Sequence, residues 1–436
     1  MKKVKILVFP CGSEIGLEIQ RSLKDIYYID LAGASSVDDH GRFVYEKYYG
    51  GIPFVNHPDF ISKINELTER IKADFIFPAL DDITLKLSEE RENLNAKILT
   101  SEKLAVSVCR DKLLTYELLK KEYFCPEFYT DISEISKEAE YPVFVKPRTG
   151  QGSKGAVKIN DYNDLENWLK KQESPQVVCE YLCGEEFTVD CFTDRKGELR
   201  YVSCRNRGRI KSGISVYSSL QPADEKVRKI AGIINEKLPM RGVWFFQLKQ
   251  NNAGEYKLLE IAPRVAGTMC LQRAAGVNLP LLTVLDAMDC DVEILPQCDR
   301  AEVDRAFYNN FRLPFDFNEL YIDFDDTIII RGKVNTSVMR LLYQCANKKI
   351  PVYLVTKHDG DIREILKKYK ISEDLFEKIY HIDPSDPNAK KTDIISPGRN
   401  ALFLDDSFSE RREITQKFNI PAYGVDSVET LIDWRG

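Results

Sequence analysis

Short apolar runs alternate with amphipathic segments along the first hundred residues. Three of the runs have the length of buried strands: Lys5–Phe9, Tyr27–Ala32 and Phe75–Pro78. The segments between them, such as Phe60–Ile71, place apolar residues at the spacing of a helix face. Alternation of strands and helices predicts a parallel sheet with helices on its faces, so we expect an α/β domain over residues 1–103.

The pattern changes after Ser101, where strand patterns begin to outnumber helical ones. Helical patterns cover Lys103–Lys121, Leu165–Lys170 and Lys226–Lys237. Strand patterns cover Val143–Lys146, Val157–Ile159, Val177–Tyr181, Phe187–Phe192, Leu199–Arg205, Val243–Lys249 and Tyr256–Ile261. This mixture predicts an α+β domain over residues 104–312.

A third region begins after the segment Arg312–Phe317, which has the pattern of a linker. Three short apolar runs follow and are separated by helical patterns: Leu320–Ile322, Val352–Val355 and Ala401–Leu404. We therefore expect a second, small α/β domain over residues 318–436.

Composition narrows the function classes. The chain has 436 residues, too many for one core, and a formal charge of −6 without a basic tail, so no nucleic-acid partner is expected. No apolar stretch approaches the roughly 20 residues of a spanning helix, so no membrane is expected either. The eleven cysteines form no CxxC pair, and the initial apolar run stops at Pro10 without a cleavage site. These features predict reduced thiols and a cytoplasmic protein.

A glycine-rich turn follows the apolar run that ends at Lys146. Gly150, Gly152 and Gly155 fall within six residues, which lets backbone N–H groups approach an anion closely. The residue order of a Walker loop is absent, and a strand rather than a helix follows the turn. The turn therefore predicts a hairpin flap over phosphates with one lysine beside it. The alternative is a surface β-hairpin with a lysine at its base.

Two side chains on later strands are candidate metal ligands. Gln247 lies in the run Val243–Lys249, and Glu260 lies in the run Tyr256–Ile261. On adjacent strands these two side chains can face each other and offer the oxygen ligands that Mg²⁺ prefers. Between the glycine-rich turn and these runs, residues 176–190 have the pattern of a strand, a short acidic hinge and a second strand.

Together these segments resemble the ATP-grasp family, in particular its carbamoyl-phosphate-synthase-like members, over about residues 1 to 310. The resemblance implies ATP as a cofactor and a parallel-sheet domain that precedes the ATP-grasp domain. It implies phosphate contacts from the lysines, a flap from the glycine-rich turn, an adenine-binding hinge and a ribose-binding acid. The ATP-binding residues that it implies are Lys112, Lys146, Gly152, Ser153, Gly155, Glu180, Tyr181, Leu182, Glu186 and Gln247.

The same resemblance implies catalysis with Mg²⁺. Gln247 and Glu260 match metal ligands, and Arg264 matches the arginine that steadies the transferred phosphoryl group. Ala262 stands where many relatives have Asn, which removes one ligand of a second Mg²⁺. The implied reaction joins a small carboxylate to a nucleophilic acceptor through an acyl phosphate. Such relatives are often homodimers, and their acceptor site corresponds here to the strand ends at Gly12–Gly16 and Asp81-Asp82.

Basic residues alternate from Arg205 through Arg207 and Arg209 to Lys211. Within one strand this spacing places four cations on one face. We expect Arg205, Arg207 and Arg209 to receive an acidic substrate or the acyl phosphate. The alternative is a solvated cationic edge strand.

Polar residues follow each of the three apolar runs near the C-terminal end. Asp323 and Asp325 follow the first run, Thr356 follows the second, and Asp405-Asp406 follow the third. Open α/β sheets build their sites at the carboxyl ends of strands. Two carboxylates two residues apart can divide the roles of nucleophile and acid/base. We therefore expect a site that handles phosphate esters.

This region resembles the haloacid-dehalogenase (HAD) phosphatase family over about residues 318 to 436. The resemblance implies a small Rossmann-like domain with no cap or a minimal one, because the gaps between the motifs are short. It implies Asp323 as the nucleophile, Asp325 as the acid/base, Thr356 as a phosphate ligand and Lys391 (or else Lys390) as the cation on the intermediate. The implied Mg²⁺ site contains Asp323, Asp325, Asp405 and Asp406, with Glu410 as a further acidic position.

The sequence thus predicts a bifunctional enzyme. One part is an ATP-dependent, ADP-forming ligase of a carboxylate and an amine or similar nucleophile. The other is a Mg²⁺-dependent phosphatase that acts on a phosphorylated compound of the same pathway. Two alternatives remain: an ATP-grasp kinase with an independent phosphatase, and a nucleotide-binding or scaffold protein without catalysis.

Overall fold

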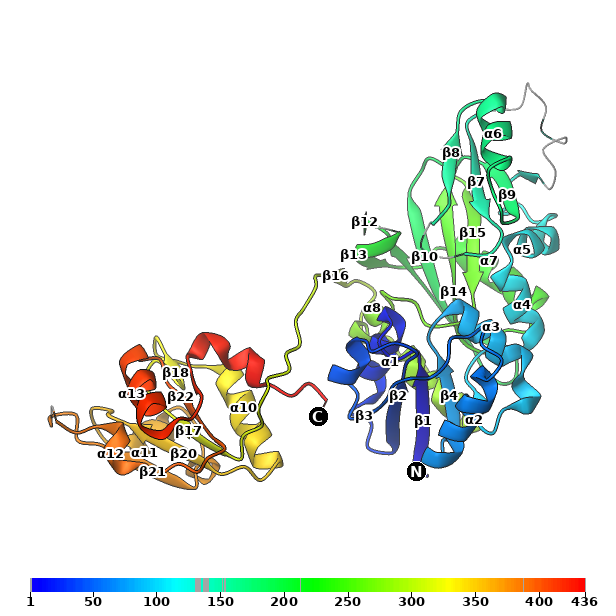
Figure 1. Ribbon diagram of the computed structural model, residues 1–436. Coiled ribbons are helices and arrows are strands. Elements are labelled where there is room, and N and C mark those ends of the chain that lie inside the picture. Colours follow the sequence, from blue (N-terminus) through cyan, green and yellow to red (C-terminus); the bar gives the residue numbers. More distant parts are fainter. Residues whose placement is uncertain are drawn as a thin grey trace. The chain divides into compact units, whose positions relative to one another are not determined.

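The computed structural model divides the chain into two compact units, Met1–Phe307 and Tyr308–Gly436 (Figure 1). It describes residues 2–129, 135, 141–150, 152, 154–211, 213–386 and 388–435. The two domains expected over residues 1–103 and 104–312 lie in the first unit, except for the last five residues of the second. Apolar side chains of the expected linker, among them Leu313, Phe315 and Phe317, pack against the core of the second unit. That segment therefore belongs to the second unit.

The first unit begins with a parallel sheet in the strand order β3-β2-β1-β4-β5. Its strands are β1 (Val4–Phe9), β2 (Ile29–Ala34), β3 (Lys47–Tyr49), β4 (Phe75–Pro78) and β5 (Lys97–Ile98). The helices that follow these strands are α1 (Glu14–Leu23), α2 (Phe60–Ile71) and α3 (Asp81–Glu89). Ile6 of the central strand pairs with Leu31 on one side and Phe75 on the other. The parallel sheet predicted for this region is confirmed.

The helical region expected at Lys103–Lys121 is two helices, α4 (Lys103–Arg110) and α5 (Lys112–Leu119). Asp111 separates them because its carboxylate accepts hydrogen bonds from the N–H groups of Leu113 and Leu114 and so caps α5. This break places Lys112 in the first turn of a helix.

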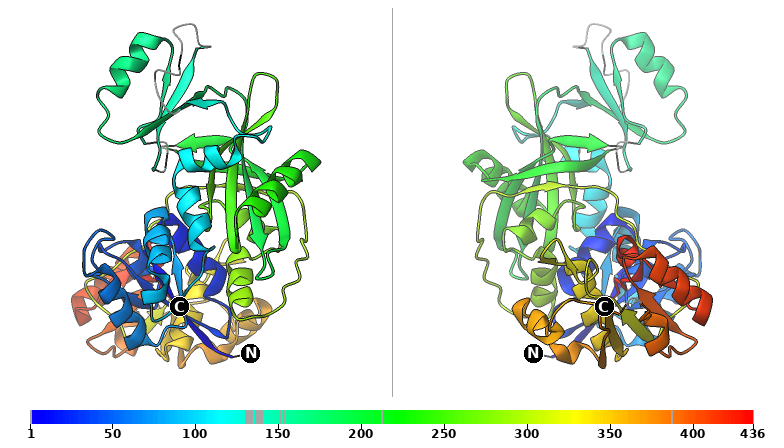
Figure 2. Two further views of the ribbon diagram at one scale, coloured as in Figure 1. Left: turned by 90° about the vertical axis from the view of Figure 1, so that its right-hand side faces the viewer. Right: turned by 90° about the vertical axis from the view of Figure 1, so that its left-hand side faces the viewer.

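The rest of the first unit consists of two antiparallel sheets. The smaller one has the order β6-β9-β7-β8 and carries α6 (Tyr162–Leu169). Its strands are β6 (Phe128–Tyr129), β7 (Val143–Pro147), β8 (Val157–Ile159) and β9 (Gln176–Glu180). Figures 1 and 2 show this sheet and α6 as a lobe at one end of the unit in every view.

The larger sheet has the order β12-β13-β11-β10-β14-β15, and β16 pairs with β13. Its strands are β10 (Glu186–Thr193), β11 (Leu199–Asn206), β12 (Arg209–Lys211), β13 (Ile214–Gln221), β14 (Gly242–Gln250), β15 (Tyr256–Ala262) and β16 (Glu302–Asp304). Its helices are α7 (Glu225–Lys237), α8 (Cys270–Ala274) and α9 (Leu279–Ala287).

The side-chain alternation of β14 positions the site. Trp244, Phe246 and Leu248 lie in one core cluster with the buried residues of α7. Side chains alternate across a strand, so Phe245 and Gln247 lie on the opposite face. That face borders the cavities described below.

The second unit is a parallel sheet in the order β21-β20-β17-β22-β23. Its strands are β17 (Glu319–Ile322), β20 (Val352–Thr356), β21 (Lys378–His381), β22 (Ala401–Leu404) and β23 (Ala422–Tyr423). Its helices are α10 (Thr336–Asn347), α11 (Ile362–Lys368), α12 (Lys391–Ile394) and α13 (Phe408–Phe418). The three apolar runs lie in β17, β20 and β22, and central β17 pairs with both of the others.

Between β17 and β20, residues 323–351 hold one hairpin and α10. The hairpin consists of β18 (Ile329–Ile330) and β19 (Lys333–Val334). This span therefore contains no separate cap domain.

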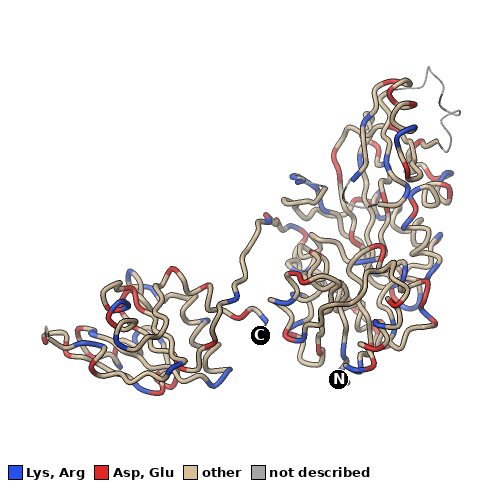
Figure 3. Tube along the Cα trace, viewed as in Figure 1, with Lys and Arg blue, Asp and Glu red and all other residues tan. Residues whose placement is uncertain are grey.

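The helices and the distribution of charge bear on two classes of partner, membranes and nucleic acids. None of the helices described here has the length and apolar character needed to cross a membrane. Acidic and basic positions are interspersed along each unit (Figure 3).

Candidate functional site

A cleft in the first unit is bordered by the β7–β8 hairpin, the segment that joins β9 to β10, and the strands β14 and β15. It holds about 950 Å³ of empty space that is partly open to solvent. Its walls combine apolar residues, such as Phe144 and Leu258, with charged groups at one end.

Lys146 provides a fixed cation in this cleft. The residue is only 7% exposed, and its Nζ donates to the Tyr116 hydroxyl at 2.6 Å and the Leu259 carbonyl at 3.2 Å. The Nζ also lies 5.1 Å from the centre of the Tyr116 ring, within the range of a cation–π contact. These partners account for two of the three N–H groups of the ammonium, which leaves one donor for an anion in the cleft.

Lys112 ties the start of α5 to the glycine-rich turn. Its Nζ donates to the carbonyl of Gly150 at 3.2 Å, and its backbone N–H donates to the carbonyl of Arg148. Burial lowers the pKa of Lys112, and the charge of Lys146 lowers it further, while Glu260 opposes both effects. The two lysines place positive charge at one end of the cleft.

The expected hairpin flap is present, because β7 and β8 pair in antiparallel fashion on either side of the turn. Gly152 and Gly155 have positive φ angles, of 66° and 74°, that favour glycine. Gly213, in the turn between β12 and β13, packs so closely on the Gly152 backbone that a Cβ atom would collide with it. Ser153 lies outside the described residues.

The segment between β9 and β10 forms the other end of the cleft. Glu180, Tyr181, Leu182 and Glu186 all line it. Glu180 accepts a hydrogen bond from the Glu127 N–H at 2.9 Å, and Glu186 forms an ion pair with Arg207 at 3.0 Å. Backbone groups beside apolar side chains suit a flat heteroaromatic ring, and a carboxylate nearby can accept hydrogen bonds from hydroxyl groups.

Gln247 and Glu260 are register partners on β14 and β15. The expectation that they face each other is therefore confirmed. Both line the cleft, and their oxygens are hard ligands that suit Mg²⁺, which completes its coordination with phosphate oxygens and water. The two side chains fit one such ion.

A second cavity shares Gln247 and Glu260 with the cleft and extends toward α1. Arg264 lies in its wall and donates to both carboxylate oxygens of Asp81, at 2.5 and 2.8 Å. Burial alone would raise the pKa of Asp81, but the charge and hydrogen bonds of Arg264 outweigh burial and lower it. Arg305 and Glu14 also line this second cavity, and their side chains form an ion pair.

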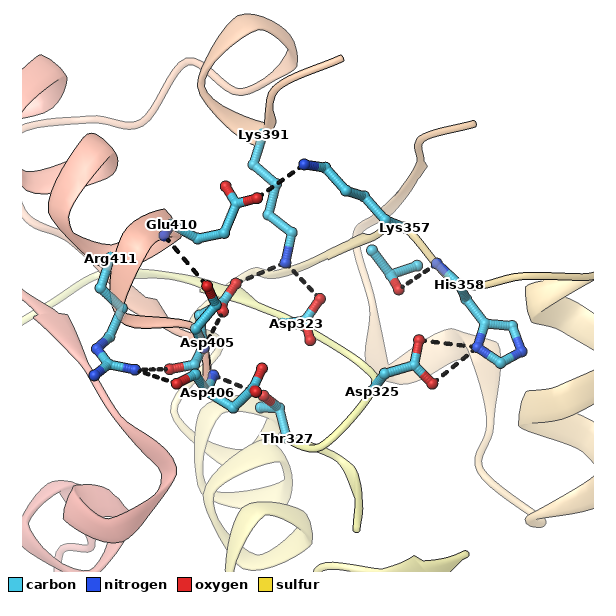
Figure 4. A network of polar contacts seen from close by, with 12 residues as sticks. Asp323, Asp325, Thr327, Lys357, His358, Lys391, Asp405, Asp406, Glu410 and Arg411 are labelled. Atoms are coloured by element: carbon cyan, nitrogen blue, oxygen red, sulfur yellow. Dashed lines mark hydrogen bonds and ion pairs between the residues drawn. The ribbon is translucent and has the colours of Figure 1, made fainter. Parts of the chain in front are cut away.

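In the second unit, the carboxyl ends of β17 and β22 bring Asp323 and Asp405 together around Lys391 (Figure 4). All three side chains are buried, and the Lys391 Nζ donates to Asp323 at 2.5 Å and to Asp405 at 2.6 Å. Burial raises the pKa of Asp323 to about 7 even though Lys391 opposes the shift. The pKa of Asp405 is raised for the same reason.

Asp323, Asp405 and Asp406 form a possible metal site, because one oxygen from each lies within 4.8 Å of the others. Three carboxylate oxygens suit a hard divalent cation such as Mg²⁺. Asp325 was expected in this set, but its carboxylate instead contacts the imidazole of His358. The structure therefore groups three of the four expected acidic ligands.

The remaining expected residues of this site lie around the cluster. Thr356 is fully buried at the end of β20, and its hydroxyl accepts a hydrogen bond from the His358 N–H. Lys390 pairs with Glu413 rather than with the cluster, so the geometry favours Lys391 as the cation. Glu410 lies beside the cluster and pairs with Lys357.

Comparison with known proteins bears on the fold that contains this cleft. The N5-carboxyaminoimidazole synthetase of Staphylococcus aureus, complexed with ADP, has a TM-score of 0.57 and 18% identity over 67% of this chain and 79% of its own. The biotin carboxylase domain dimer of the Hydrogenobacter thermophilus 2-oxoglutarate carboxylase, complexed with MgADP, ADP and bicarbonate, has a TM-score of 0.55 and 16% identity over 68% and 72%. A family described as "ATP-grasp in the biosynthetic pathway with Ter operon" matches residues 172–305. This chain contains an ATP-grasp domain.

Residues 172–305 include the β9–β10 hinge, Gln247, Glu260 and Arg264 of the ATP-grasp domain. A D-alanine–D-alanine ligase of Thermotoga maritima is 27% identical over 194 residues. That alignment covers 39% of this chain and 62% of the ligase, so the chain spans less than two thirds of that relative.

The expected row of four cations on one strand face of the ATP-grasp domain is wrong. Arg205 lies in β11 and Arg209 in β12, and the chain between the two strands is irregular at Arg207-Gly208. Arg205 is only 2% exposed and donates to the Asp190 carboxylate and the Thr268 hydroxyl. Arg209 instead pairs on the surface with Asp304, as the alternative of a solvated edge predicts.

Replacing Arg205 with methionine is expected to destabilise the ATP-grasp domain by about 3–5 kcal/mol, because Asp190 is left as an uncompensated buried charge. Urea unfolding of the two proteins measures the difference. The matched control is Arg209→Met, which removes an exposed ion pair and is expected to cost less than about 1 kcal/mol. Equal effects of the two substitutions would contradict the role of burial.

Three residues of these sites were not predicted from the sequence. Tyr116 and Arg305 meet their partners only through long-range packing. His358 was detectable in principle, since it follows Thr356 at the end of β20, where the sequence already predicts a site.

Proposed function

We propose that the ATP-grasp domain is an ATP- and Mg²⁺-dependent, ADP-forming ligase that activates a small carboxylate as an acyl phosphate for a nucleophilic acceptor. The observation that carries this proposal is the wall formed by Gln247 and Glu260, which line both the cleft and the second cavity. A phosphoryl group placed at this wall lies between a nucleotide on one side and a carboxylate on the other.

The residues around the wall have the charges that phosphoryl transfer requires. Lys146 neutralises phosphate oxygens from the cleft, and Arg264 presents its guanidinium to the second cavity, where Asp81 holds it in place. Gln247 and Glu260 would hold Mg²⁺, which when bound supplies further positive charge to the phosphoryl group. Catalysis of this kind depends on positioning and on charge neutralisation. The ADP and MgADP bound to the two structural relatives support the choice of nucleotide and metal.

For the second unit we propose a phosphatase of the HAD type. An Asp323 carboxylate oxygen bonds to phosphorus, the ester P–O bond breaks, and the leaving oxygen takes a proton from Asp325. A water oxygen then bonds to phosphorus, the bond to Asp323 breaks, and Asp325 takes back a proton from the water. The buried contacts of Lys391 with Asp323 and Asp405 support this assignment, because they place one cation beside the attacking group. Asp323, Asp405 and Asp406 would hold Mg²⁺.

We further propose that the two activities serve one cytoplasmic pathway, with a phosphorylated acceptor or product that the second unit dephosphorylates. Small molecules are then the partners of both sites. The carboxylase relative is described as a domain dimer, which supports the expectation of a homodimer for this chain.

An acyl phosphate is tested by trapping it with hydroxylamine. The purified protein, incubated with ATP, Mg²⁺, hydroxylamine and a panel of small carboxylic acids, is expected to release ADP and to form one hydroxamate per ADP with the correct acid. Mass spectrometry and a coupled ADP assay measure the two products. A stable phosphorylated product without hydroxamate would instead establish the kinase alternative, and the absence of ADP with every acid would support the scaffold alternative.

A further inference from the structure

We propose that His358 is a positioning residue that holds the Asp325 carboxylate in place for proton transfer to the leaving group. This inference rests on the phosphatase function proposed for the second unit. It concerns a residue outside the set that was expected from the sequence.

The contact between the two side chains is short and two-fold. The His358 Nδ1 lies 2.9 Å from each oxygen of the Asp325 carboxylate (Figure 4). The Asp325 side chain is 52% exposed, and among the described residues His358 is its hydrogen-bond partner. An aspartate this exposed samples several rotamers unless a neighbour restrains it. The imidazole is the restraint that the structure shows.

His358 is itself held from several sides. Its ring packs edge-on against Phe324, with 5.3 Å between ring centres, and its side chain is only 16% exposed. Its N–H donates to the Thr356 hydroxyl at 3.0 Å, and its carbonyl accepts from the His381 Nε2 at 2.8 Å. A group fixed in this way can transmit its position to a mobile partner.

The chain around Asp325 separates it from the charged cluster. Asp326 adopts a left-handed conformation with φ of 52°, and Asp325 forms an isolated bridge with Ile329. Figure 4 shows the Asp325 carboxylate turned toward His358 and away from Asp323 and Lys391. The cluster would therefore hold phosphate and metal without this carboxylate, which leaves it available for protons.

The role predicts a specific kinetic signature. When His358 is lost, the Asp325 carboxyl is free to turn into solvent, and the leaving oxygen departs without a proton. A poor leaving group such as phenolate depends on that proton, whereas nitrophenolate is stable without it. Misplacement of a catalytic group by about 1 Å can lower a rate by about 10²-fold.

The test uses the full chain with Mg²⁺ and a series of aryl phosphates from p-nitrophenyl to phenyl phosphate. The measured quantity is kcat/KM, which reports the steps up to formation of the aspartyl phosphate. We expect His358→Ala to lower kcat/KM for phenyl phosphate by about 10²-fold. For p-nitrophenyl phosphate we expect a change of less than threefold. His358→Asn, whose amide nitrogen can take the place of Nδ1, is expected to restore most of the activity on phenyl phosphate.

The results distinguish a failure of the positioning role of His358 from a failure of the proposed phosphatase function. An equal loss on all substrates, or no loss on any, would overturn the positioning role while leaving the phosphatase assignment intact. Absence of hydrolysis in the wild type, or hydrolysis that survives Asp323→Asn, would overturn the phosphatase function and the inference with it. His358→Leu fills the space beside Phe324 and replaces the alanine variant if that variant does not fold.

Discussion

Replacing Lys146 with methionine is expected to lower ATP-dependent ADP formation by about 10²–10³-fold, the effect of losing one fixed donor to a transition-state charge. Methionine keeps the unbranched, apolar part of the side chain, so the packing beside Tyr116 is largely preserved. The substitution removes the ammonium that the Tyr116 hydroxyl and the Leu259 carbonyl fix in the cleft. A coupled assay for ADP measures the loss.

The matched control is Lys170→Met, which removes a lysine that lies outside the cleft and is mostly exposed. It is expected to leave ADP formation unchanged. Thermal unfolding of the Lys146 variant shows whether the fold survives. Removal of the ammonium leaves the Tyr116 oxygen without this donor, at about 1–3 kcal/mol for a buried group, whereas the Leu259 carbonyl keeps the Tyr116 hydroxyl as a donor at 2.8 Å. Wild-type ADP formation in a folded Lys146 variant would mean that the phosphates bind elsewhere.

The substitution Asp323→Asn is expected to lower phosphate monoester hydrolysis by about 10⁴-fold or more, as the loss of a nucleophile does in other enzymes with covalent intermediates. Asparagine is nearly isosteric with aspartate and can still accept a hydrogen bond from Lys391. The two units are separately compact, so ADP formation by the ATP-grasp domain is expected to continue. Release of inorganic phosphate from p-nitrophenyl phosphate measures the first effect, and the ADP assay measures the second.

Asp326→Asn serves as the control for this second experiment. Asp326 is exposed, lies in the same loop and has a left-handed conformation that asparagine also adopts readily. It is expected to retain full phosphatase activity. In a mixture of metabolites, a compound one phosphate heavier than the final product should accumulate with Asp323→Asn alone. If no such compound accumulates, the two sites act on separate substrates and the proposed coupling is wrong.

Much of the nucleotide cleft was predictable because its signals are local. The glycine-rich turn follows the run that ends at Lys146, and the hairpin around it depends on neighbouring residues only. The pairing of β14 with β15 follows from two adjacent strands joined by a short turn, but a register shift between Gln247 and Leu248 makes Glu260 rather than Leu259 the partner of Gln247. The strand ends that carry Asp323, Thr356 and Asp405 were predictable for a similar reason, since each apolar run is short and continuous.

The rest depended on contacts between distant segments. Nothing near Arg264 in the sequence indicates that Asp81 is its partner, and Asp81 itself lies in the first turn of α3 rather than at a free strand end. The row from Arg205 to Lys211 has the period of one strand, but an irregular segment at Arg207-Gly208 divides it. Very short strands such as β5 carry too few residues for a period to show.

The wall formed by Gln247 and Glu260 has a consequence for how such enzymes diversify. The cleft includes residues of the β7–β9 region, whereas the second cavity includes residues of α1, the segment 264–268 and Arg305, and Gly152, Lys154, Arg207 and Gly213 line both. Glu14 and Arg305 line the second cavity and not the cleft, so we expect substitutions there to change which small molecule is selected and to leave the proposed nucleotide site unaltered. A duplicated gene can acquire a new product in this way while its energy source stays the same, which accounts for relatives of different chemistry that share one fold at 16–18% identity.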